Sequence, residues 1–337
     1  MSANRFDQII ALWEPRLKAA FNDAIYGIRN AAQIEQIVRM LESGDFDGAL
    51  RAVGLDPLQF RALEKAIYDA YEGGGNYVAK SIPALRDPNG ISVVFRFAVR
   101  NVIAEAWLRD YSAALIRDIL EDQRYMVRQF LSYGLSQGLN PRSVALDLVG
   151  RINRLTKRRE GGLIGLTSSQ EEWVRSYADA LASDNPLDAL SRSLRDKRFD
   201  AVVRSYVAQG KPIPADKIDA MVAAYKNRAL RYRGENIART ETLRALHEAQ
   251  QEAIRQAIES GQVAAKDVTM IWRTAKDNRV RDSHRAMNGQ RVSYGSSFTS
   301  GNGVSIRFPC DPRAPANETI NCRCFCEASI DFLSGIK

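Results

Sequence analysis

The feature that most constrains the fold is the helical spacing of apolar residues, which continues from the start of the chain to about residue 260. Apolar side chains recur there at intervals of three and four residues, which places them on one face of an α-helix. In segment 140–155, Asn140 is a natural N-cap and Pro141 suits the first helical position. The segment then carries one apolar stripe, formed by Val144, Leu148, Ile152 and Leu155. We expect a helix here.

The same spacing predicts three further helices. Thr167 and Gln170 match a capping box. The face predicted to be buried behind it consists of Trp173, Val174, Tyr177 and Leu181. Pro214 opens another helix, with inward positions at Ile218, Met221, Val222 and Tyr225. A long helix should also cover roughly residues 100–131.

The pattern is interrupted at residues 71–90, where three consecutive glycines precede two prolines and a further glycine. Glycine and proline are the strongest local breakers of helices, so we expect a long loop or a hinge. This loop could divide the helical region. The chain shows no internal repeat and no low-complexity tract.

The character of the chain changes after residue 265. Residues 267–275 alternate in the manner of a strand, and the following residues are rich in Gly, Pro, Ser and Asn between short β-like runs. These runs contain few apolar residues, so we expect them to pack against a helix at 236–260. The fold class that follows is mainly α, with an extended helical N-terminal region at residues 1–230 and a small α+β C-terminal domain at residues 231–337.

Composition narrows the cellular setting. The chain has 337 residues, of which 45% are hydrophobic, and a net charge of +8, which favours a polyanionic neighbour such as nucleic acid. No apolar run approaches the roughly 20 residues that span a bilayer, so we expect no membrane. The N-terminus reads as an amphipathic helix and not as a signal peptide, so we expect the protein to begin in a reducing cytoplasm.

All four cysteines lie within the last 28 residues, at positions 310, 322, 324 and 326. A disulfide knot is disfavoured in a reducing compartment. A tetrahedral zinc site built from His284, Cys310, Cys322 and Cys324 is one alternative, although cysteines two apart on a strand splay and make poor joint ligands. Buried thiols acting as small hydrophobic groups are the interpretation we favour, so we expect no cofactor.

A catalytic Cys–His pair is a further alternative, with His284 oriented by Asp277 or Asp282. The chain has no nucleophile elbow, no phosphate-binding glycine loop and no HExxH. We therefore expect that the protein is not an enzyme.

Three stretches in fixed order resemble the C-terminal domain of the phage Mu F-like minor head proteins, the phage head morphogenesis family. They lie at residues 235–250, 272–292 and 309–324. The resemblance covers about 100 residues and depends on the ordered combination of short motifs. The positions that match are Arg239, Thr240, Glu241, Trp272, Asp277, Arg279, His284, Gly289, Asn321, Cys322, Arg323 and Cys324.

The resemblance also implies a metal site in many relatives, with a Cys-x-x-Cys before the glycine and a His-x-x-Cys at the end. In this chain the two cysteines of the first pair correspond to Arg281 and His284, and the histidine of the second corresponds to Thr319. Two of the four ligands are therefore missing.

The resemblance suggests a structural role for the helix residues. We expect Arg239 to donate to backbone carbonyls of the turn at 321–324, and Glu241 to accept from Arg279 or Arg323. We expect Asp277 to lie in a tight turn and form the hydrogen bonds usual for an aspartate there. We expect Trp272 to be buried as an anchor of the core.

Two basic stretches, 151–160 and 226–233, could contact DNA phosphates without sequence specificity and with strong salt dependence. No base-reading motif is visible. The candidate residues are Arg151, Arg154, Lys157, Arg158, Arg159, Lys226, Arg228, Arg231 and Arg233.

The resemblance implies a minor head protein of a tailed phage that assists head assembly, DNA packaging or ejection. Its implied partners are the portal protein, capsid proteins and packaged double-stranded DNA, with several copies in each particle. The implied location is the capsid interior near the portal, and the host cytoplasm during assembly. Two alternatives remain: a metal-dependent or Cys/His-dependent nuclease or toxin-like enzyme, and a DNA-binding accessory protein unrelated to virions.

Overall fold

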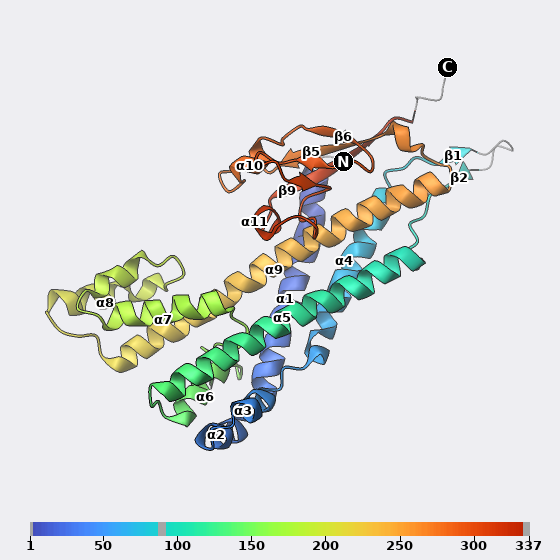
Figure 1. The fold of residues 1–337 in the computed structure, drawn as a ribbon. Coiled ribbons are helices and arrows are strands. Elements are labelled where there is room, and N and C mark those ends of the chain that lie inside the picture. The colour runs from blue at the N-terminus through green and yellow to red at the C-terminus, as the bar shows by residue number, and fades with distance from the viewer. Residues whose placement is uncertain (1–2, 87–91, 333–337) are drawn as a thin grey trace. The chain divides into compact units, whose positions relative to one another are not determined.

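The computed structural model describes residues 3–86 and 92–332. It divides the chain into two compact units (Figure 1). Unit 1 contains Met1–Ala20, Leu63–Ser112 and Glu235–Lys337, and unit 2 contains Phe21–Ala62 and Ala113–Gly234. Each unit is therefore assembled from segments that are far apart in the sequence.

The protein is mainly α-helical, with short strands concentrated in the C-terminal region, which confirms the predicted fold class. The helices are α1 Ala3–Ala31, α2 Ile34–Glu42, α3 Phe46–Val53, α4 Arg61–Ala79, α5 Val102–Ser136, α6 Pro141–Val149, α7 Ser168–Ala182, α8 Asp200–Ala208, α9 Ala215–Glu259, α10 Asp282–Arg285 and α11 Ala316–Thr319. The strands are β1 Leu85–Arg86, β2 Ser92–Val93, β3 Arg151–Ile152, β4 Arg159–Glu160, β5 Val268–Thr274, β6 Arg291–Ser293, β7 Phe298–Thr299, β8 Ser305–Ile306 and β9 Cys324–Ile330. Among the described residues, no helix is both long enough and apolar enough to cross a bilayer.

Several helix starts lie where the sequence predicts them. The Asn140 side chain accepts hydrogen bonds from the first turn of α6, and Thr167 and Gln170 form the predicted capping box of α7. The long helix expected at about 100–131 is α5. Local capping chemistry therefore locates α6 and α7, and apolar spacing locates α5.

The prediction of a continuous helix through residue 155 is wrong. Helix α6 ends at Val149, and Gly150 adopts φ 94°, a conformation that favours glycine. A Cβ on Gly150 would lie 2.7 Å from the carbonyl oxygen of Glu160. The chain turns there into the antiparallel β3–β4 hairpin, which leaves Ile152 60% and Leu155 93% exposed.

The prediction that Trp173 is buried is also wrong, because 43% of its surface is exposed. Its predicted companions Val174, Tyr177 and Leu181 are buried. The buried face of α7 is thus narrower than the apolar pattern indicated. On α9, Met221 and Tyr225 are buried, whereas Ile218 and Val222 are half-buried.

The first part of the expected loop at 71–90 is helix, because α4 continues through the three glycines to Ala79, whereas residues 80–84 form neither helix nor strand. Residues 87–90 of that prediction lie outside the described residues. A Cβ on Gly74 would lie 3.1 Å from the Cα of Leu246, and one on Gly75 would lie 2.1 Å from the Phe97 ring. The glycines therefore permit close packing in unit 1 and do not form a hinge.

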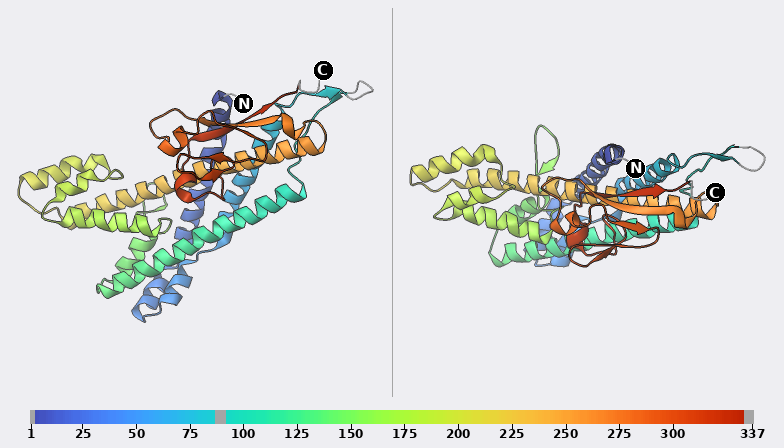
Figure 2. Two further views of the ribbon diagram at one scale, coloured as in Figure 1. Left: turned by 45° about the horizontal axis from the view of Figure 1, so that its top comes forward. Right: turned by 90° about the horizontal axis from the view of Figure 1, so that it is seen from above.

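The C-terminal part of unit 1 contains an antiparallel sheet in the order β6–β5–β9 (Figures 1 and 2). In its register, Trp272 lies opposite Cys326 and Thr274 lies opposite Cys324. Gln250 of α9 donates to the Cys326 carbonyl at 3.2 Å. The strands therefore pack against the 236–260 part of α9, as the sequence predicts.

Unit 2 has a buried polar centre around the segment after β4. The guanidinium of Arg29 is fully buried and donates to the carbonyls of Gly162 and Ile164 at 2.8 and 2.9 Å. Gln123 of α5 donates to the Leu166 carbonyl and accepts from the Gly165 N–H. These contacts satisfy backbone groups of an irregular segment that would otherwise be buried without partners.

Helix α9 is continuous across residue 230, where we expected the boundary between helical region and C-terminal domain. Unit 1 joins residues 235–337 to two segments from the first 112 residues. The domain boundary stays a prediction, because a compact unit is not by itself an independently folding domain.

Candidate functional site

The turn that leads into β9 is held by two adjacent residues of α9. The Arg239 Nε donates to the Cys322 carbonyl at 3.2 Å, and the Thr240 hydroxyl accepts from the Asn321 N–H at 2.9 Å. Asn321 adopts φ 55°, which asparagine tolerates better than most residues. Arg239 also pairs with Glu14 of α1 at 3.0 Å. The expected contact between Arg239 and the turn is confirmed.

The partner expected for Glu241 is wrong. Glu241 is buried against the Tyr111 hydroxyl of α5 and the guanidinium of Arg244. Burial raises the pKa of Glu241, and Arg244 opposes that shift. The Nε of Arg244 also donates to the Cys310 carbonyl at 2.8 Å. Glu241 thus orients an arginine that holds the loop carrying the first cysteine.

Asp277 lies in the turn after β5, as predicted. Its carboxylate accepts from the Arg279 N–H at 3.0 Å and from the Arg323 Nε at 2.6 Å. Burial acts to raise the pKa of Asp277, but these hydrogen bonds outweigh it and lower the pKa. Arg323 therefore has its own carboxylate partner, which explains why it does not pair with Glu241.

Trp272 is fully buried at the centre of the sheet, as expected for a core anchor. Its ring meets those of His284 and Phe298 edge to face, each at a centroid distance of 5.3 Å. Gly289, at φ 85°, donates its N–H to the Trp272 carbonyl at 2.8 Å. These motif residues form one packed arrangement around His284.

His284 and the cysteines converge in this core. The Nδ1 of His284 lies 3.4 Å from the Cys322 Sγ and 3.5 Å from the Cys324 Sγ. The Cys310 thiol interacts with that of Cys322 and donates to the Thr319 carbonyl at 3.3 Å. Hydrogen bonds from the Cys310 and Cys324 thiols lower the pKa of Cys322, whereas burial raises the pKa of Cys310. All four cysteines are free and buried.

On its other side, the His284 Nε2 lies 2.9 Å from the Glu318 Oε2. Cys322, His284 and Glu318 thus have the order of a nucleophile, a base and an orienting carboxylate. None of the three is more than 1% exposed. A thiol enclosed to this degree cannot reach a substrate, so the arrangement favours a structural role.

Cys326 is not part of this cluster. Its N–H donates to the Nε2 of His247 at 3.0 Å, and burial raises the pKa of its thiol to about 12. Cys322 and Cys324 therefore contact His284, whereas Cys326 contacts His247. Strand β9 begins at Cys324, so Cys322 belongs to the preceding turn.

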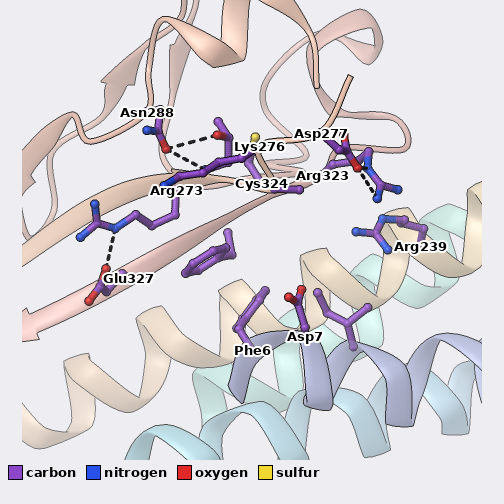
Figure 3. A pocket seen from close by; sticks show the side chains of 14 residues that line it. Phe6, Asp7, Arg239, Arg273, Lys276, Asp277, Asn288, Arg323, Cys324 and Glu327 are labelled. Atoms are coloured by element: carbon purple, nitrogen blue, oxygen red, sulfur yellow. Dashed lines mark hydrogen bonds and ion pairs between the residues drawn. The ribbon is translucent and has the colours of Figure 1, made fainter. Parts of the chain in front are cut away.

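A cavity of about 630 Å³ lies beside β9 in unit 1 (Figure 3). Two pairs of charged side chains bond to each other in its wall, Arg273 with Glu327 at 2.6 Å and Arg323 with Asp277. Phe6 of α1 stacks on Phe325 with a centroid distance of 5.3 Å. Asp7, Lys276 and Arg239 also line the cavity, so charged side chains of both signs surround its aromatic floor.

The basic residues singled out from sequence differ in accessibility. Arg151, Arg154, Lys157, Arg158 and Arg231 are exposed, and Arg159 and Arg228 are half-buried. Lys226 is buried at 3.9 Å from Asp147, and Arg233 is buried and donates to the Gly165 carbonyl. These last two are structural and are not accessible to DNA.

Sequence reasoning missed Tyr111, Arg244, His247 and Glu318. Tyr111 lies 130 residues before Glu241, so no local pattern relates them. Glu318 lies between a proline-rich loop and the cysteines and resembles an ordinary surface residue until its burial is seen. For His247, the one signal in the sequence was rarity, because the chain contains only two histidines.

Residues 178–327 match the model of the family described as Phage Mu protein F like protein. This confirms the resemblance inferred for the C-terminal region and extends it upstream through α8 and the whole of α9. The comparisons with curated proteins and with solved structures found no match.

Proposed function

We propose that this chain is a minor head protein of a tailed phage. The observation that carries the proposal is the family match over residues 178–327, within which the motif residues assemble around α9. Those residues bind one another and the backbone of the C-terminal loops. The proposed role is therefore assembly and binding without catalysis.

The proposed partners are the portal protein and the capsid proteins, with several copies of the chain in each particle. The proposed location is the capsid interior near the portal, and the host cytoplasm before the head is complete. The enclosure of Cys322, His284 and Glu318 supports this proposal over a Cys/His-dependent enzyme, because a hydrolytic nucleophile must be accessible.

We assign the proposed DNA contact to the β3–β4 hairpin of unit 2, the green loop that projects from its helices in the right view of Figure 2. Arg154 and Lys157 are exposed there and form no side-chain hydrogen bond or ion pair with the described part of the chain. Arg151 pairs with Asp147 at 3.0 Å, and Arg158 lies 3.7 Å from Asp23. The two unpaired cations are the best placed to bind phosphates.

Co-sedimentation tests the proposed function. The chain is co-expressed with the portal and major capsid proteins of its phage, and the particles are separated on a density gradient. We expect the chain to sediment with procapsids that contain portal. A folded chain that stays at the top of the gradient, while portal and capsid proteins assemble, would contradict the proposal.

A further inference from the structure

We propose that His284, Cys310, Cys322 and Cys324 bind one Zn²⁺ ion in a tetrahedral site, with Glu318 as the carboxylate that orients the histidine. This goes beyond the proposed head function and does not depend on it. The ligands differ from those implied for relatives, because Arg281 and Thr319 stand at two of the implied positions.

The separations between the donor atoms fit a tetrahedral zinc site. With Zn–S near 2.3 Å and Zn–N near 2.0 Å, sulfur and nitrogen ligands at the tetrahedral angle lie roughly 3.6 Å apart. The Nδ1 of His284 lies 3.4 and 3.5 Å from the sulfurs of Cys322 and Cys324, and all three donor atoms lie within 4.8 Å of one another. A neutral imidazole nitrogen has one lone pair, so a single S–H···N hydrogen bond does not account for both contacts.

We assign the fourth ligand position to Cys310, whose thiol interacts with that of Cys322. The Cys310 Sγ is not among the three donor atoms that lie within 4.8 Å of one another, so its side chain turns toward them when the metal binds. Cys310 adopts φ 66°, an uncommon conformation for a residue with a side chain, and Arg244 holds its carbonyl at 2.8 Å. Its Sγ also lies 3.3 Å from the Thr319 carbonyl, at the position where relatives are implied to carry a histidine. Cys310 thus lies beside the backbone of the residue that stands at the missing ligand's position.

The outer contacts of the site position the imidazole. Glu318 lies 2.9 Å from the Nε2 of His284 on one side of the ring, and the Nδ1 on the other side faces the sulfurs of Cys322 and Cys324. The carboxylate is itself held by the Asn302 amide at 2.7 Å and the Ser283 hydroxyl at 3.0 Å. A buried carboxylate on the far ring nitrogen is the usual companion of a zinc-binding histidine.

The indole of Trp272 leaves a buried donor beside the cluster. Its N–H has no hydrogen-bond partner among the described residues. A thiolate ligand gives this donor a partner. Sulfur and imidazole ligands in a tetrahedral arrangement select Zn²⁺ over Mg²⁺ or Ca²⁺.

Metal content tests the proposal directly. The full-length chain is produced in medium with zinc, purified under reducing conditions without chelators and analysed by mass spectrometry for metals, with circular dichroism to verify folding. We expect one zinc per chain. Exchange for Co²⁺ should give the intense visible absorption of a tetrahedral site with sulfur-to-metal charge-transfer bands.

The cysteine outside the cluster provides a matched control. Cys326→Ala should retain zinc and the Co²⁺ spectrum, whereas Cys322→Ser should lose both. Glu318→Gln leaves every ligand in place and should weaken zinc binding by about 10- to 100-fold in competition with a chromophoric chelator. A folded wild-type chain that contains no zinc and gives no tetrahedral Co²⁺ spectrum would overturn the proposal and leave the thiols as packing groups only.

Discussion

His247 illustrates how burial determines the protonation state of a single side chain. Its Nδ1 lies 2.7 Å from the Leu243 carbonyl, and its Nε2 accepts the Cys326 N–H at 3.0 Å. The ring therefore needs a proton on Nδ1 and a lone pair on Nε2, which only the neutral imidazole provides. Burial lowers the pKa of His247 to about 4.

Acid should consequently destabilise the fold through this residue. The unfolded chain takes up the His247 proton near pH 6.5, whereas the folded chain resists it until about pH 4. Stability from this group is present above pH 6.5 and is lost as the pH falls through that window, by up to about 3 kcal/mol. Urea unfolding between pH 7 and pH 4 measures it. His247→Gln, which keeps one donor and one acceptor, should show a shallower loss, and an identical loss would contradict the assignment.

Arg239 should stabilise unit 1 through the turn before β9. Arg239→Ala removes the donor to the Cys322 carbonyl and the ion pair with Glu14, so we expect a loss of about 1–3 kcal/mol in the free energy of unfolding. The matched control is Arg231→Ala on the same helix, where the arginine is exposed and the change should stay within about 0.5 kcal/mol. Chemical denaturation of both variants compares them, and equal effects would contradict the role given to Arg239.

The sequence predicted the Arg239 contact but assigned Glu241 a wrong partner. Arg239 was predictable because both it and the Cys322 turn lie in recognisable motifs. The actual partners of Glu241, Tyr111 and Arg244, depend on how α5 packs against α9 within unit 1. The sequence of α5 or of α9 alone contains no pattern that would reveal this packing.

At the scale of elements, the glycines of α4 show why the sequence predicted a loop where the structure has a helix. Three glycines in a row indicate a break, since each lowers helix stability by about 1 kcal/mol relative to alanine. Tertiary packing overrides this preference, because Phe97 and Leu246 occupy the space that side chains would need. The close packing between segments of unit 1 therefore outweighs the low helix propensity of the glycines.

Gly75→Ala should therefore destabilise the protein although it improves helix propensity. The new Cβ would meet the Phe97 ring at 2.1 Å, and overpacking of this kind costs about 1–3 kcal/mol. Thermal unfolding measures the loss. In the background of Phe97→Leu the same substitution should cost less, and a loss that is unchanged in that background would contradict the contact.

The β3–β4 hairpin tests the DNA-contact proposal at the same scale. Arg154→Glu with Lys157→Glu should weaken binding to duplex DNA and reduce the slope of log K against log salt by about 2, one for each lost phosphate contact. Fluorescence anisotropy at several salt concentrations measures both. The matched control, Arg124→Glu with Lys197→Glu, changes two exposed cations elsewhere in unit 2 by the same charge. Equal losses in the two variants would show that only net charge matters.

At the scale of the whole molecule, the sequence predicted the order of the regions but not how they combine. Helical periodicity and the glycine- and proline-rich end were sufficient for a mainly α chain with a small α+β C-terminal region. The composition of the two units was not predictable, because each draws on segments that are not adjacent in the sequence. Contacts such as Arg239 with Glu14, 225 residues apart, are set by the assembled fold.

The central claim is that the chain is a component of the phage head, and quantitative mass spectrometry of purified particles tests it most directly. Mature virions and heads that have not packaged DNA are banded on density gradients and washed at high salt before digestion. We expect peptides of this chain in the heads, in constant proportion to the portal protein. A chain that is abundant in the infected lysate but absent from both kinds of particle would contradict the account.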